Sequence, residues 1–166
     1  MKNQTHLDTI RVGVIAGAAG GLAEIAFVTL YAAATGGDVA VLARSVTIAA
    51  GASALFPSIP VALGVSVHMA LAVVLGIALA FAWRALVSLR AGTGPYPFML
   101  VALVGVWAIN FFVVLPMVSP AFIHLLPYSI SLISKLSFGL AAATALRWQL
   151  GATSRRRKSS FVASAS

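Results

Sequence analysis

The chain has 166 residues, of which 61% are hydrophobic and only 8% are charged, and its net charge is +8. Soluble domains carry about 25% charged residues, so this composition excludes an ordinary soluble domain and indicates an integral membrane protein. The basic residues gather at the ends of apolar runs, a pattern that is typical of membrane topology and predicts no nucleic-acid partner. The absence of cysteine excludes disulfides and thiol chemistry.

The first apolar run predicts a membrane span over residues 10–34, preceded by a short, mobile polar arm at residues 1–9. The run exceeds the 7–15 apolar residues of a signal-peptide core and contains Glu24, so we expect it to be retained as a span. Small residues at intervals of four predict a face on which another helix backbone can approach closely. This face carries Gly13, Gly17 and Gly21. Glu24 continues it, three residues further on.

Residues 39–56 form an apolar segment whose relation to the membrane is ambiguous. Asp38 is the predicted N-cap, and Pro57 and Pro60 end the segment. Arg44 lies about 9 Å along a helix from Asp38, close enough for its side chain to reach the membrane surface. We therefore predict an interfacial or re-entrant helix here, with a further full span as the alternative.

Three more spans are predicted, over residues 61–83, 97–116 and 121–146. Pro127 is expected to kink the last of them. Gly76 and Gly139 are further candidate packing residues. The sequence thus predicts an all-α fold, an integral membrane bundle of four transmembrane helices with one shorter helix, in a single transmembrane domain over residues 10–150.

Residues 151–166 are predicted to be a basic, disordered cytoplasmic tail. The basic run in this tail is expected to contact anionic lipid head groups. It consists of Arg155, Arg156, Arg157 and Lys158.

Four spans would bring both termini to one side of the membrane, together with most of the basic residues. That side would hold Lys2, Arg11, Arg84, Arg90, Arg147 and the run at 155–158, against Arg44 alone on the other. The positive-inside rule then places both termini in the cytoplasm. A fifth span would move Lys2 and Arg11 outside. The pattern is typical of small bacterial inner-membrane proteins, and we expect that location.

Lys135 stands in the middle of the last apolar run, where an unpaired cation would be costly. By helical rise, it and Glu24 lie about 18 and 20 Å from Arg147 and Arg11, hence at similar depth near the bilayer centre. We predict that they pair and draw the first and last helices together. By the same arithmetic, other spans contribute to this polar layer. Its further members are His68, Asn110 and Ser131, with Ser134 and Tyr128 extending it.

Two functional hypotheses follow from this layer. In the first, the pair is structural, and the protein is a non-enzymatic subunit or accessory factor of a membrane assembly, or a homo-oligomer. In the second, Glu24, His68 and Lys135 form the path of a minimal proton- or ion-coupled transporter. An intramembrane enzyme is least supported, because no catalytic motif is present. No cofactor or metal is expected: His68 and His124 lie at different depths for a haem, and Glu24 with His68 lacks a third ligand.

Overall fold

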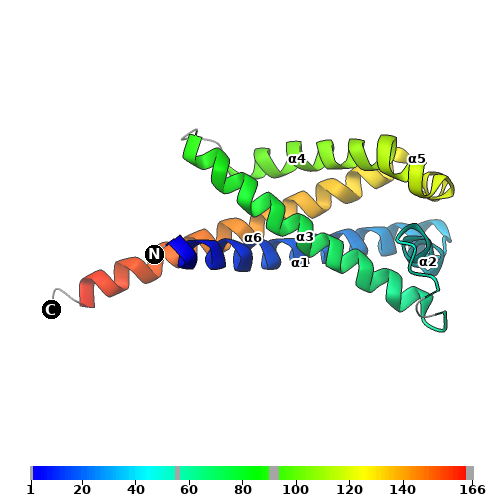
Figure 1. Cartoon of the computed structure of the whole chain (residues 1–166). Coiled ribbons are helices and arrows are strands. Elements are labelled where there is room, and N and C mark those ends of the chain that lie inside the picture. Colours follow the sequence, from blue (N-terminus) through cyan, green and yellow to red (C-terminus); the bar gives the residue numbers. More distant parts are fainter. Residues whose placement is uncertain (1, 55–56, 90–93, 164–166) are drawn as a thin grey trace.

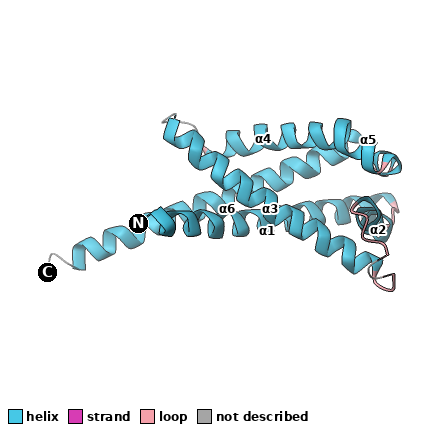
Figure 2. Ribbon diagram, in the orientation of Figure 1, coloured by secondary structure: helices cyan, strands magenta, loops and turns pink. Residues whose placement is uncertain are grey.

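The computed structural model describes the backbone of residues 2–54, 57–89 and 94–163, and the side chains of residues 6–54, 57–87 and 94–151. Within these residues all regular secondary structure is helical (Figure 2). Four of the described stretches are long and apolar enough to cross a membrane. They are His6–Thr35, Pro60–Val87, Pro95–Val118 and Tyr128–Gly151. The predicted all-α membrane bundle is therefore confirmed, although several of its boundaries differ.

The first helix, α1 (Lys2–Thr35), begins earlier than the sequence suggests. The arm expected at residues 1–9 belongs to this helix from Lys2 onward. A contact with α3 (Pro60–Leu89) holds the start of α1 in place: Arg84 Nη1 donates a hydrogen bond of 2.8 Å to Thr9 Oγ1. This hydrogen bond joins the N-terminal part of α1 to the C-terminal part of α3.

The ambiguous segment forms a short helix, α2 (Val39–Ala49), which ends well before residue 56. Its 11 residues extend about 17 Å, too short to cross an apolar layer of about 30 Å, so the alternative of a further span is wrong. Asp38 is the N-cap, as predicted, and also contacts Arg44 Nη2 at 3.4 Å. The buried Thr47 donates a hydrogen bond of 2.6 Å to the carbonyl of Pro60, which attaches α2 to the start of α3.

The third predicted span contains a change of helix type. It consists of α4 (Pro95–Ile109), a π-helical turn (Asn110–Val114) and α5 (Leu115–Val118). The wide turn ends two residues before Pro116, whose ring nitrogen has no hydrogen to bond the preceding turn. A π-turn is a common way for a helix to absorb such an interruption.

The last span differs most from its prediction. Residues Pro120–His124 form a 3₁₀ helix, and α6 begins only at Tyr128, immediately after Pro127. Proline disfavours helical geometry in the residue before it. The helix is therefore interrupted here, and the span is not one continuous, kinked helix. At its other end α6 continues to Ala163, so the backbone of residues 151–163 is helical and not disordered as expected. The side chains of Arg155 to Lys158, and with them the predicted head-group contacts, lie outside the described residues.

The helices pack around α1 and α6, which lie alongside each other (Figure 1). Helix α3 crosses α1 diagonally, and α4 packs on α6. Helices α3 and α4 diverge toward the end of the bundle where α2 and α5 lie, and they make little contact with each other. Both termini lie at the opposite end (Figure 1).

The predicted glycine face of α1 packs directly against the backbone of α3. A Cβ atom on Gly13 would lie 2.5 Å from Ile77 Cα, and one on Gly17 would lie 2.8 Å from Val73 Cα. Gly76 of α3 lies opposite Gly17 of α1, and Gly21 of α1 packs against Ala72 of α3. These glycines therefore allow a backbone approach that a larger residue would block.

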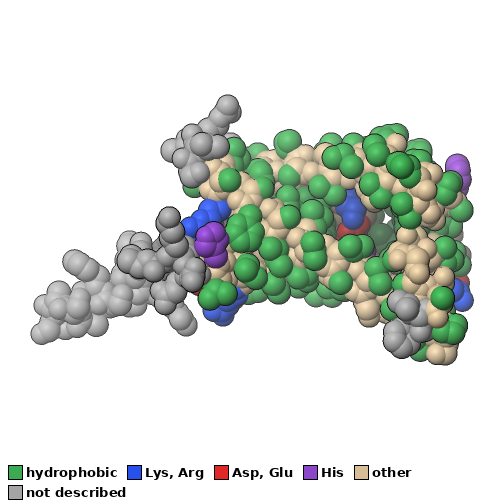
Figure 3. All heavy atoms as spheres, viewed as in Figure 1, with side chains coloured by type: hydrophobic (Ala, Val, Ile, Leu, Met, Phe, Trp, Pro, Cys, Tyr) green, Lys and Arg blue, Asp and Glu red, His purple; other side chains and the backbone are tan. Residues whose placement is uncertain are grey.

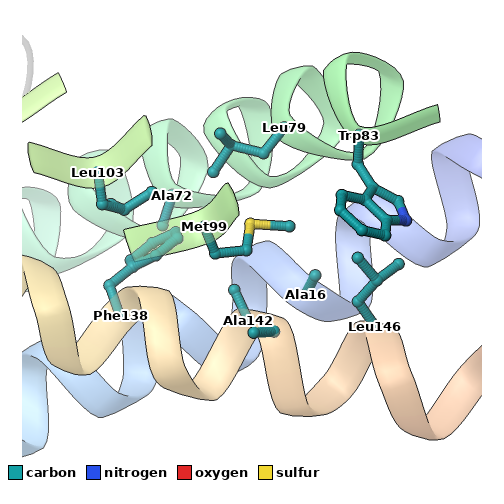
Figure 4. Packing of buried hydrophobic residues seen from close by; sticks show 10 residues of the cluster. Ala16, Ala72, Leu79, Trp83, Met99, Leu103, Phe138, Ala142 and Leu146 are labelled. Carbon is teal, nitrogen blue, oxygen red and sulfur yellow. The ribbon is translucent and has the colours of Figure 1, made fainter. Parts of the chain in front are cut away.

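A compact core of apolar side chains joins all four long helices (Figure 4). Phe138 of α6 packs over Gly20 of α1, where an added Cβ would lie 2.6 Å from its ring. Met99 and Leu103 of α4 are completely buried in the same cluster as Phe138. Gly139 packs less tightly than the α1 glycines, because a Cβ there would make an ordinary 3.5 Å contact with Leu100.

Candidate polar site in the bundle

The centre of the site is an ion pair between α1 and α6. Lys135 Nζ lies 2.7 Å from Glu24 Oε1 and 2.9 Å from Oε2, and Ser134 Oγ donates a further hydrogen bond of 3.2 Å to Oε1. The side chains of Glu24 and Lys135 are 10% and 17% exposed. The contact predicted from the sequence is therefore present. It is a closed, nearly buried pair in which both carboxylate oxygens accept hydrogen bonds.

Helical spacing brings these groups together. On α6, Ser131, Ser134, Lys135 and Phe138 recur at intervals of three or four and share one face. On α1, Glu24 lies one turn beyond the glycine against which Phe138 packs. The close approach of the two backbones at that point holds the ammonium and the carboxylate within hydrogen-bonding distance.

His68 of α3 is the third ionisable group at the site. Its Nε2 lies 3.8 Å from Glu24 Oε2, too far for a hydrogen bond. This nitrogen is buried and has no hydrogen-bond partner among the described residues. The sequence correctly places His68 beside the pair, but it gives no sign that the imidazole would stop short of bonding to it.

Ser131 belongs to a second polar contact, separate from the ion pair. It accepts a hydrogen bond of 2.8 Å from Trp107 Nε1 of α4 and donates one of 3.2 Å to the carbonyl of Tyr128. The ring of Trp107 also packs near Phe111 and Tyr128. Sequence reasoning overlooked Trp107 as a donor to Ser131. The single predicted layer thus consists of two neighbouring groups.

A cavity of about 490 Å³ extends from the ion pair toward the end of the bundle that carries α2 and α5. We call it the central cavity. Its polar lining includes Glu24, His68, Asn110, Ser131, Ser134 and Lys135. Asn110 lines this space without a side-chain hydrogen bond to any other described residue, so it joins the predicted layer only by facing the same cavity. The remaining walls are mostly apolar.

The arrangement of these residues suits pairing between helices and binding of a small polar group. Glu24 and Lys135 neutralise each other, and the described residues contain no cluster of three or more His, Cys, Asp or Glu side chains suited to a metal ion. His124, considered with His68 for a haem, is exposed at the end of the 3₁₀ helix and does not line the central cavity. No protein-family model, curated protein or solved structure matches this chain.

Proposed function

We propose that the protein is a non-enzymatic subunit or accessory factor of a membrane assembly, or a homo-oligomer, in which the Glu24–Lys135 pair organises the bundle. The observation that supports this most directly is the geometry of the pair. Lys135 bridges both oxygens of Glu24, and Ser134 adds a further hydrogen bond. A carboxylate held in this way joins two helices and leaves little capacity for a passing ion.

The lengths of the connecting segments favour the same proposal. The four candidate spans account for most of the chain, and the described connections between them are short apart from α2. Little surface therefore remains outside the apolar layer for chemistry in water. The exposed surface of the spans is rich in large apolar side chains, such as Val74 of α3 and Val101 of α4, which suit contact with lipid or with other membrane helices.

The proposal is tested with Glu24→Gln and a charge-swapped Glu24→Lys/Lys135→Glu variant. The single change leaves Lys135 without a countercharge, so we expect a several-fold loss of accumulated protein or of assembled complex. The swapped variant is expected to restore part of it. The readouts are the protein level in membranes and the identity and size of what elutes with the protein in mild detergent. A monomer that elutes alone at full yield for every variant would contradict the proposal.

A second candidate, a proton- or ion-coupled transporter, is favoured by one observation. The central cavity reaches the ion pair, and the unbonded Nε2 of His68 stands 3.8 Å from Glu24. For a transporter, Glu24→Gln would accumulate normally while flux into proteoliposomes disappeared. The protein level in membranes and the flux into proteoliposomes, both measured for Glu24→Gln, therefore separate the two candidates.

The proposed location is a bacterial inner membrane with both termini in the cytoplasm, on the basis of the distribution of basic residues. The chain has no cysteine, so single cysteines report position cleanly. We expect His6→Cys and Gly151→Cys to react with an impermeant maleimide from the cytoplasmic side, and Asp38→Cys from the other. Reaction of His6→Cys and Gly151→Cys from opposite sides would contradict the four-span topology.

A further inference from the structure

We propose that the central cavity binds a neutral lipophilic molecule that ends in one hydroxyl or carbonyl group and enters from the lipid phase between α3 and α4. Such a molecule would be a ligand of the chain itself. It would bind in the same way whether the chain serves as a subunit, an oligomer or a transporter.

The size and lining of the cavity suit a lipophilic ligand. Its volume of about 490 Å³ falls within the range of roughly 300–1,000 Å³ that is usual for small-molecule sites. Its apolar walls come from helices α1 to α6, as well as from the 3₁₀ helix. Representative wall residues are Leu42, Leu71, Phe111, Val114, Phe122 and Phe138. A mostly apolar molecule therefore fits this space, with its polar end at the inner end of the cavity.

The charges at the inner end select a neutral ligand. Glu24 and Lys135 are bound to each other at 2.7 Å, so their charges cancel. An anionic or cationic head group would then be buried without a countercharge, which is strongly unfavourable in an apolar environment. The paired charges still create a polar surface, which a hydroxyl or carbonyl can approach.

Two residues that line the cavity carry uncommitted hydrogen-bonding groups, and that of His68 is a buried ring nitrogen. Within the described part of the chain, His68 Nε2 has no hydrogen-bond partner, and the Asn110 amide makes no side-chain hydrogen bond. Both residues line the cavity. A single imidazole nitrogen offers either a donor or an acceptor, and an amide offers both, so a single hydroxyl or carbonyl can be recognised here. Because these two groups lack partners, a ligand with one polar end would bind better than a fully apolar one.

The entrance of the central cavity opens onto the apolar outer surface of the bundle. Several wall residues of the cavity are also exposed at its surface: Leu71 of α3 is 61% exposed, and Val118 of α5 is 56% exposed. Figure 3 shows charged side-chain atoms at the bottom of a hollow that is surrounded by hydrophobic side chains. An opening with such a border faces lipid, so the ligand arrives from the membrane.

The test uses the full chain in lipid nanodiscs and a hexadecan-1-ol that carries a photoreactive diazirine in its chain. We expect labelling to concentrate on peptides that contain Leu71, Val114 and Phe138. Unlabelled hexadecan-1-ol is expected to suppress this labelling at least tenfold more effectively than hexadecane, palmitate or hexadecylamine. Together, these competitors separate the need for a polar end from the need for neutrality.

Matched variants identify the cavity as the site. Val114→Trp fills the cavity and is expected to remove most of the labelling, whereas Val101→Trp, on a 74% exposed position of α4, is expected to leave it unchanged. A His68→Leu/Asn110→Leu variant removes the polar atoms of both side chains and is expected to bind hexadecanol no better than hexadecane. Labelling spread evenly over the four spans would overturn the proposal. So would competition by palmitate or hexadecylamine equal to that of hexadecanol.

Discussion

Replacement of Lys135 with methionine is expected to lower the free energy of unfolding of the bundle by about 3–5 kcal/mol. The methionine side chain is similar in length, so the main loss is the ammonium group that bonds both oxygens of Glu24. The carboxylate would keep only its hydrogen bond from Ser134, at 8% exposure of the residue. The measurement is denaturation in detergent micelles, followed by circular dichroism.

Two controls separate this effect from a general loss of charge. Arg44→Met removes the partner of Asp38 in an ion pair whose side chains are 48% and 59% exposed, and it is expected to cost less than about 1 kcal/mol. The double variant Glu24→Gln/Lys135→Met leaves no stranded charge and is expected to recover much of the stability. If Lys135→Met were no more damaging than Arg44→Met, the pair would not be organising the bundle.

Gly17→Ala is expected to destabilise the protein by about 1–3 kcal/mol, the usual result of overpacking. The new methyl group would collide with the backbone of α3, lying 2.8 Å from Val73 Cα and in contact with the carbonyl of Ala72. Backbone atoms cannot turn aside as a flexible side chain can, so α1 and α3 would have to separate. This separation would also disturb the position of Glu24 further along α1.

The matched control for this change is Gly105→Ala in α4. A Cβ atom at Gly105 meets nothing within 4 Å, so the substitution adds a methyl group without a collision. Alanine is also a better helix former than glycine, so the stability is expected to stay the same or rise slightly. Thermal unfolding of the two variants in the same detergent compares them directly. Equal stability of the two would show that the α1–α3 packing tolerates extra volume.

The features that could be predicted from the sequence are those that the apolar environment dictates. A lone lysine within an apolar span needs a partner, and Glu24 is the acid placed at a matching depth, so their contact follows from elementary electrostatics. The spacing of Gly13, Gly17 and Gly21 likewise indicates a close helix contact. The sequence does not say, however, that this face receives α3 while the flanking Gly20 receives Phe138 of α6.

The features that escaped prediction depend on local chain geometry and on the tilt of whole helices. Pro127 is compatible with either a kink or a break of the helix, and the spacing of residues around it in the sequence does not distinguish the two. The hydrogen bond from Trp107 to Ser131 depends on the rotation of α4 relative to α6. The central cavity exists because α3 and α4 diverge, which no periodicity along the chain reveals.

The distance along the chain between the paired charges has a consequence for biosynthesis. Lys135 follows Glu24 by 111 residues. At a synthesis rate of about 5–20 residues per second, the acid is made roughly 6–22 s before its cation. A carboxylate in an apolar layer without a countercharge is strongly unfavourable. The acid of the first helix therefore has no partner until the last helix arrives, so completion of the polypeptide coincides with closure of its fold.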